Sequence, residues 1–134
     1  MSITFTDQDK ATLRIAAYGA VALLTAAGVA GGKPHRISTD GSIALASATG
    51  AVGHVLGEKP GAVKLNDKTV AALADQVLPA LTESMSLLKR QDPAEADNFR
   101  SIVLLALEAA THRGEPSPTM TDMIRKITNA LDAA

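Results

Sequence analysis

The chain has 134 residues, with thirteen Lys and Arg against fourteen Asp and Glu, and it contains no cysteine. The net charge of −1 gives no overall attraction for a polyanion, and the aromatic content of 2% leaves no stacking platform, so we expect no nucleic-acid partner. The lack of cysteine excludes disulfides, thiolate zinc sites and cysteine nucleophiles. The length fits a single domain over residues 1–134.

The first predicted helix covers residues 7–30. Thr6 can cap its free amides, and Asp7 and Asp9 lie in the first turn, where the helix dipole favours negative charge. Apolar residues then face most directions, which is typical of a buried helix. Residues 15–32 carry no formal charge and approach the length of a membrane span, but their many Ala and Gly residues make insertion unfavourable. We therefore expect a buried central helix and no membrane partner.

A polar connection over residues 31–42 separates this helix from a second one, predicted over 40–57. Ser38, Thr39 and Asp40 are candidate caps for the second helix. Residues 42–57 of this helix contain three glycines, each of which costs about 1 kcal/mol in a helix interior, so the helix needs neighbouring elements to hold it. The i, i+4 spacing of Gly53 and Gly57 is typical of closely packed helix interfaces within one chain or between two copies.

A third helix is predicted over 67–89 because apolar residues recur every three or four positions from Val70 to Leu88. Pro79 interrupts this pattern and predicts a bend, since proline cannot donate its amide.

The fourth helix, over 93–112, has the clearest start signal. Asp92 is the expected cap, Pro93 occupies the first helical position, and Glu95 completes a D-P-x-E variant of the capping box. Residues 102–107 are too apolar for a surface helix and predict a second central element. A fifth helix follows over 118–132. The predicted fold is thus an all-α, compact bundle of about five helices.

One segment favours ligand binding, because basic side chains lie beside the expected N-terminus of the second helix. Free backbone amides and positive charge together suit a small anion. The alternative is an ordinary solvated loop whose hydroxyls cap the helix. The candidate ligand-binding residues are Lys33, His35, Arg36, Ser38 and Thr39.

Other candidate sites have simpler structural interpretations. The three histidines, His35, His54 and His112, are scattered and have at most one carboxylate each at helical spacing, so we expect no metal and no cofactor. Ser86 and Lys89 match S-x-x-K, but the companion motifs of the penicillin-recognising enzymes are absent, and we interpret the pair as the polar edge of a helix. No catalytic residue is predicted.

The stretches YGAVALLTAAG and LPALTESMSLLKRQDPAEADNFRSIVL resemble a family of small, uncharacterised all-α proteins of high-GC bacteria. The resemblance implies a bacterial cytoplasmic helical protein and brings no catalytic or binding residue with it. The acidic N-terminal segment, which lacks the basic start of an export signal, also favours the cytoplasm.

Apolar helical surface is the most abundant feature that this sequence predicts. We therefore expect a non-enzymatic helical interaction or scaffold protein that pairs as a homodimer through apolar helices or binds another protein. The alternative is a small-anion or small-ligand binding protein, or an enzyme, that uses the 31–42 loop.

Overall fold

A computed structural model of the chain describes residues 4–27, 43–45, 48–58, 65–66, 68–111 and 118–134. They contain no strand, which confirms the predicted all-α class. In addition to a short helical segment at 43–45, the described residues form α1 (Asp7–Ala27), α3 (Gly50–Glu58), α4 (Val70–Gln91), α5 (Pro93–Thr111) and α6 (Pro118–Asp132).

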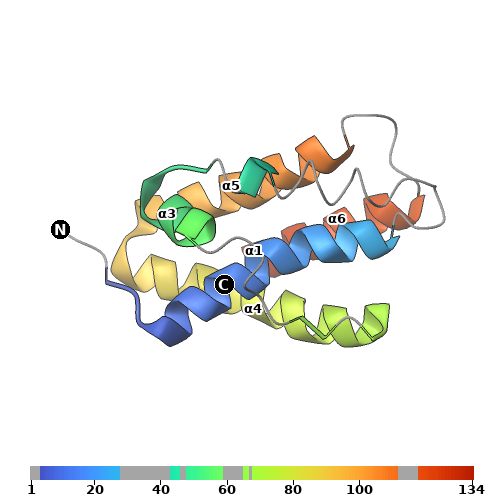
Figure 1. Cartoon of the computed structure of the whole chain (residues 1–134), viewed down its shortest axis with the longest axis horizontal. Coiled ribbons are helices and arrows are strands. Elements are labelled where there is room, and N and C mark those ends of the chain that lie inside the picture. The colour runs from blue at the N-terminus through green and yellow to red at the C-terminus, as the bar shows by residue number, and fades with distance from the viewer. Residues whose placement is uncertain (1–3, 28–42, 46–47, 59–64, 67, 112–117) are drawn as a thin grey trace.

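The four long helices α1, α4, α5 and α6 lie side by side and alternate in direction in chain order (Figure 1). Contacts between α1 and α4 show this: the Ser84 hydroxyl lies 3.5 Å from the Thr12 carbonyl oxygen, while Gly19 meets Val77. The short α3 lies against the N-terminal halves of α1 and α5. The result is a four-helix bundle with one additional helix on its side.

Helix α1 is the central element that the sequence predicts. Leucine and alanine side chains on most of its circumference are buried. Its closest partner is α4, and a Cβ atom at Gly19 would overlap the Val77 side chain, so glycine permits the two backbones to approach. In the part of the chain that the structure describes, no helix is long and apolar enough to cross a membrane.

Helix α1 also begins as predicted. The Thr6 hydroxyl accepts a hydrogen bond from the Asp9 amide at 3.0 Å, and the Asp9 carboxylate accepts one from the Thr6 amide at 3.1 Å. This reciprocal pair is a capping box with aspartate in the place of glutamate.

Helix α4 runs without interruption through Pro79, and the bend predicted there stays a prediction. The helix begins at Val70, later than the predicted residue 67, because the Thr69 hydroxyl caps it by accepting from the Ala72 amide at 3.0 Å. The position at the start of the helix leaves Val70 45% exposed, although the sequence pattern places it on the apolar stripe.

The prediction of one second helix over 40–57 is wrong within the described residues. Residues 48 and 49 are not helical, and α3 begins only at Gly50, whose φ of +85° is a left-handed conformation that a continuing helix cannot contain. A Cβ atom at Gly53 would meet the Ala48 backbone, so Gly53 accommodates the incoming chain and not a neighbouring helix.

Helix α5 buries Phe99, Ile102 and Val103 in the core, but it is not buried on all sides. Leu104 is half-buried, and Leu105 is 61% exposed. The expectation that the whole 102–107 run is buried is therefore wrong. Because α5 packs on α4, α1, α3 and α6 through one part of its circumference, the remaining part faces outward.

Candidate functional site

The predicted anion-binding segment lies outside the described residues. It stays a prediction from the sequence, as does any role of His35 and His112, which lie outside them as well. The residues concerned are Lys33, His35, Arg36, Ser38 and Thr39.

Within the described residues, polar contacts between distant parts of the chain gather at the two ends of α3. At its N-terminal end, the Glu95 carboxylate of α5 accepts a hydrogen bond from the Val52 amide at 2.9 Å. The Asn98 side-chain amide, one turn further along α5, donates to the Thr49 carbonyl at 3.0 Å. Side chains of another helix thus satisfy backbone groups that open α3.

At the C-terminal end of α3, side chains of α1 do the same for free carbonyl groups. The Arg14 guanidinium donates to the Val55 carbonyl through Nε at 3.2 Å, and the Tyr18 hydroxyl donates to the Leu56 carbonyl at 2.7 Å. Arg14 also pairs with the Glu58 carboxylate at 3.3 Å, and Lys10 lies 3.9 Å from it. We call these six side chains the α3 clamp: Lys10, Arg14, Tyr18, Glu58, Glu95 and Asn98.

Glu95 is available to the α3 clamp because the expected capping box does not close. The Asp92 amide, which Glu95 was predicted to accept from, donates to the Leu88 carbonyl at 2.7 Å and so ends α4. The Asp92 carboxylate does cap α5, since it accepts from the Ala94 amide at 3.0 Å. One residue thus ends one helix and begins the next, which releases Glu95 for a contact 43 positions away.

The sequence alone predicts no role for Arg14, Tyr18 or Asn98. The available signal is weak: Arg14 and Tyr18 lie at i, i+4 on a helix that is mostly apolar after its first turns, where two polar side chains on one face indicate a polar partner. Burial raises the pKa of the Tyr18 hydroxyl above its ordinary value of 10.0, and the nearby Arg14 charge opposes that shift.

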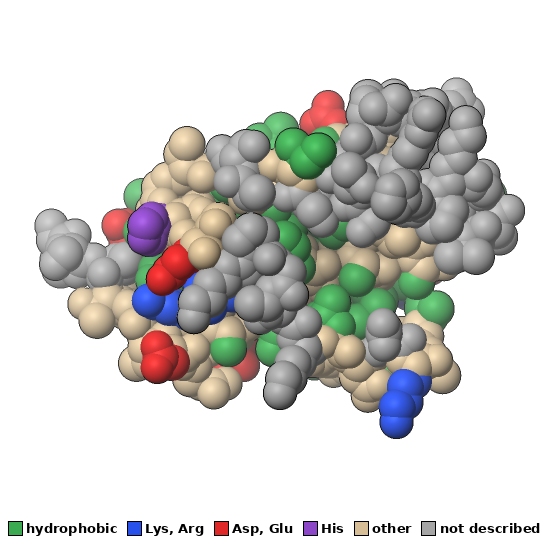
Figure 2. Space-filling model, viewed as in Figure 1, with side chains coloured by type: hydrophobic (Ala, Val, Ile, Leu, Met, Phe, Trp, Pro, Cys, Tyr) green, Lys and Arg blue, Asp and Glu red, His purple; other side chains and the backbone are tan. Residues whose placement is uncertain are grey.

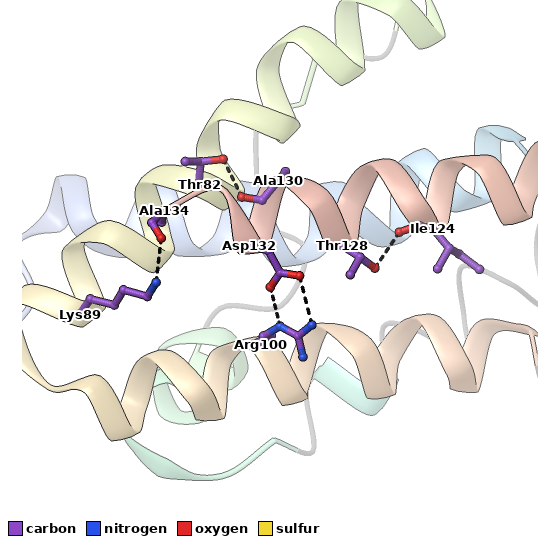
Figure 3. A network of polar contacts seen from close by, with 8 residues as sticks. All are labelled: Thr82, Lys89, Arg100, Ile124, Thr128, Ala130, Asp132 and Ala134. Carbon is purple, nitrogen blue, oxygen red and sulfur yellow. Dashed lines mark hydrogen bonds and ion pairs between the residues drawn. The ribbon is translucent and has the colours of Figure 1, made fainter.

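A second polar network joins α6 to α4 and α5 (Figure 3). The Thr82 hydroxyl donates to the Ala130 carbonyl at 2.7 Å, and Arg100 binds the Asp132 carboxylate through two nitrogens, at 2.9 and 3.4 Å. The hydrogen bond from Arg100 is the main reason that the pKa of the Asp132 carboxyl lies below its ordinary value. This network fixes α6 against its neighbours.

The S-x-x-K pair belongs to the same region. The Lys89 ammonium donates to the Ala134 carbonyl at 2.8 Å, and the Ser86 side chain is half-buried one turn earlier on α4. This contact gives Lys89 a structural partner, in keeping with its interpretation as the polar edge of a helix.

Metal ligands do not gather in the described part of the chain, where no three His, Cys, Asp or Glu side chains converge. His54 is exposed on α3 and has no neighbouring ligand set there.

Apolar side chains reach the surface in several separate places, as Figure 2 shows for one face. Among the described residues, the large exposed ones are Ile43 in the short helical segment, Val70 at the start of α4 and Leu105 in the middle of α5, with exposed fractions of 59%, 45% and 61%. Only Leu105 lies in the interior of a long helix.

Comparison with protein-family models, with curated proteins and with solved structures gives no match. The arrangement of the described polar groups therefore has to be interpreted by its own chemistry. The contacts of the α3 clamp and of the α6 network join helices to one another, and the side chain best placed to meet another molecule is Leu105.

Proposed function

We propose that this chain is a non-enzymatic interaction or scaffold protein that self-associates through the outer face of α5. The observation that carries the proposal is the 61% exposure of Leu105, an apolar side chain in the middle of a 19-residue helix. Transfer of a leucine side chain from water into an interface is favourable by about 1.5–3 kcal/mol when burial is complete.

The neighbours of Leu105 on the same face suit a second helix. We call this face the α5 outer stripe; its exposed members are Ala94, Asp97, Ser101, Leu105 and Glu108. Two of them are small, so another helix can approach closely, and they lie at the spacings of three and four residues that place side chains on one helix face.

A second copy of the chain fits this stripe in an antiparallel pairing. With a two-fold axis that crosses the outer face of α5 at the level of residue 103, Leu105 of each copy lies opposite Ser101 of the other, so a large side chain meets a small one. The same register brings Glu108 of each copy beside Asp97 of the other, about one residue apart along the helix axis, so like charges approach each other across the interface. One helix per copy makes a small interface, for which we expect weak association, with a Kd of roughly micromolar order.

Sedimentation velocity over a concentration series tests the proposal. We expect the unaltered chain to form a dimer, and Leu105→Gln to raise the dimer Kd at least tenfold. Val70→Gln is the matched control, because it removes a similar exposed apolar side chain from another helix and leaves the dimer Kd unchanged. A chain that stays monomeric at every concentration, or a Val70 variant that dissociates as readily as the Leu105 variant, would contradict the proposal.

The small-anion function stays a second proposal, and it is based on the sequence of the 31–42 loop. Lys33, His35 and Arg36 form the densest basic cluster in the sequence without an immediate acidic neighbour. Titration calorimetry with inorganic phosphate and sulfate tests it, with Lys33→Ala/Arg36→Ala as the comparison. Equal heats for the two proteins, or no heat for either, would reject this function.

A further inference from the structure

We propose that α3 is a detachable cover: it opens as one unit from the side of α1 and α5 while the four long helices stay folded. This inference concerns the α1 and α3 side of the molecule and does not depend on the association through α5. It rests on three properties of α3, namely its sequence, the origin of its caps and its place in the contact pattern.

The first property is that α3 has little helical stability of its own. It has nine residues, fewer than an isolated helix needs to be stable in water, and three of them are glycine. Glycine is the least favourable residue in a helix interior after proline, because it loses the most backbone freedom on folding. The helix therefore depends on tertiary contacts to form.

The second property is that these contacts come from outside α3 at both ends. Glu95 of α5 accepts from the Val52 amide, and Arg14 and Tyr18 of α1 donate to the Val55 and Leu56 carbonyls. When the helix leaves its place, all of these bonds break together with the burial of the Val52, Val55 and Leu56 side chains. Opening is thus cooperative over α3.

The third property is that the rest of the bundle does not depend on α3. It packs against α1 and α5, whereas α1, α4, α5 and α6 also contact one another directly. The extensive α1 and α4 pairing and the α6 network lie outside the α3 clamp. Loss of α3 therefore removes one layer from the side of α1 and α5 and leaves their other partners in position.

Amide hydrogen exchange of the intact chain under native conditions tests the proposal, because it measures opening of each segment separately. We expect the amides bonded within α3, at residues 54–58, to exchange at least 100-fold faster than the slowest amides of α1 and α4. We also expect these α3 amides to share one equilibrium constant for opening.

Two variants separate opening of α3 from unfolding of the whole chain. Tyr18→Phe removes the bond to Leu56 but keeps the buried ring, and we expect it to speed exchange in α3 about three- to tenfold. Asn98→Ala, which removes the bond to Thr49, is a second and more exposed site for the same test.

Ile127→Val is the matched control on the opposite side of the bundle. It trims a fully buried side chain of α6, so it speeds the slowest exchange in α1 and α4 about threefold or more while α3 exchange stays unchanged. If Ile127→Val speeds α3 exchange by the same factor, or if α3 amides exchange as slowly as those of α4, then α3 opens only with the whole chain and the proposal is wrong.

Discussion

The hydrogen bonds that Asp92 makes determine which partner Glu95 takes. Because the Asp92 amide closes α4 and its carboxylate opens α5, the sequence between these helices needs no further residue. The Glu95 carboxylate, freed from the local capping box, caps α3 from a distance. The motif alone therefore predicts the start of α5 correctly and the partner of Glu95 wrongly.

Gly50 is the residue that the turn into α3 requires. Its φ of +85° costs an L-residue about 1–2 kcal/mol, and a Cβ atom there would lie 2.6 Å from the Asn98 side-chain nitrogen. We expect Gly50→Ala to lower the free energy of unfolding by about 2 kcal/mol, measured by urea denaturation. Gly57→Ala is the control, because Gly57 lies in the last turn of α3 and has no positive φ, and it should be neutral or slightly stabilising. Equal effects of the two substitutions would refute this role.

Tyr18 makes the free energy of unfolding depend on pH in the alkaline range. Burial raises its pKa in the folded chain, so the unfolded chain loses the tyrosine proton first, near pH 10.0. The stabilisation from the neutral hydroxyl is complete below that pH and is lost as the pH rises from there through the raised pKa.

The measurement for Tyr18 is the free energy of unfolding from pH 8 to 11. We expect a fall above pH 10 that is steeper in the unaltered chain than in Tyr18→Phe, and the comparison removes the contribution of the lysines. Parallel curves for the two proteins would show that Tyr18 ionises alike in the folded and unfolded states.

At the scale of the element, α5 has an inner and an outer face. Apolar residues lie on both faces, so the amino-acid composition does not tell them apart. Val103 is 1% exposed and Leu105 is 61% exposed, although they are two positions apart in one apolar run. The difference of 200° around the helix axis explains this, because residues two apart in a helix point to nearly opposite sides.

Aspartate at these two positions should therefore have opposite consequences. Val103→Asp places an unpaired charge in the core, which costs several kcal/mol, while the free energy of unfolding of a typical protein is only about 5–15 kcal/mol. We therefore expect the chain not to fold. Leu105→Asp should keep the helical circular dichroism spectrum and change the free energy of unfolding by no more than about 0.5 kcal/mol. Unfolding of both variants, or of neither, would show that the two faces are assigned wrongly.

At the scale of the whole molecule, the net charge is close to zero, but the charged side chains are distributed unevenly over the surface. The charged members of the α5 outer stripe, Asp97 and Glu108, are both acidic, and Arg100 at its side is paired with Asp132. Two copies that meet through this stripe in the proposed register therefore bring like charges opposite one another.

The proposed dimer should consequently bind more tightly as salt is added. Screening shortens the Debye length from about 10 Å at 0.1 M to about 3 Å at 1 M, which weakens repulsion and leaves the apolar contact of Leu105 in place. We expect the dimer Kd from sedimentation equilibrium to fall at least threefold over this range. In the double variant Asp97→Asn/Glu108→Gln, the dependence of the dimer Kd on salt concentration should largely vanish. Weaker association at high salt would instead indicate attraction between opposite charges.

The sequence by itself determined the all-α class, the central position of α1, the start of α5 and the continuity of α4 through Pro79. These features follow from patterns that can be read within a short stretch of sequence: the period of apolar residues, the Thr6 and Asp92 caps, and an apolar stripe that continues in phase past the proline. The caps act within a few residues of the helix starts, and the stripe predicts the burial that keeps α4 intact at Pro79.

Only the tertiary structure decided where the predicted second helix breaks, which partner Glu95 takes and which leucine of α5 faces outward. The break at residues 48–49 and the caps of α3 depend on Arg14, Tyr18, Glu95 and Asn98, which lie 38 to 49 positions away from the groups that they bind. Hydrogen bonds and packing between segments that distant leave no periodic trace in the chain, because they arise only when the helices have taken their places beside one another.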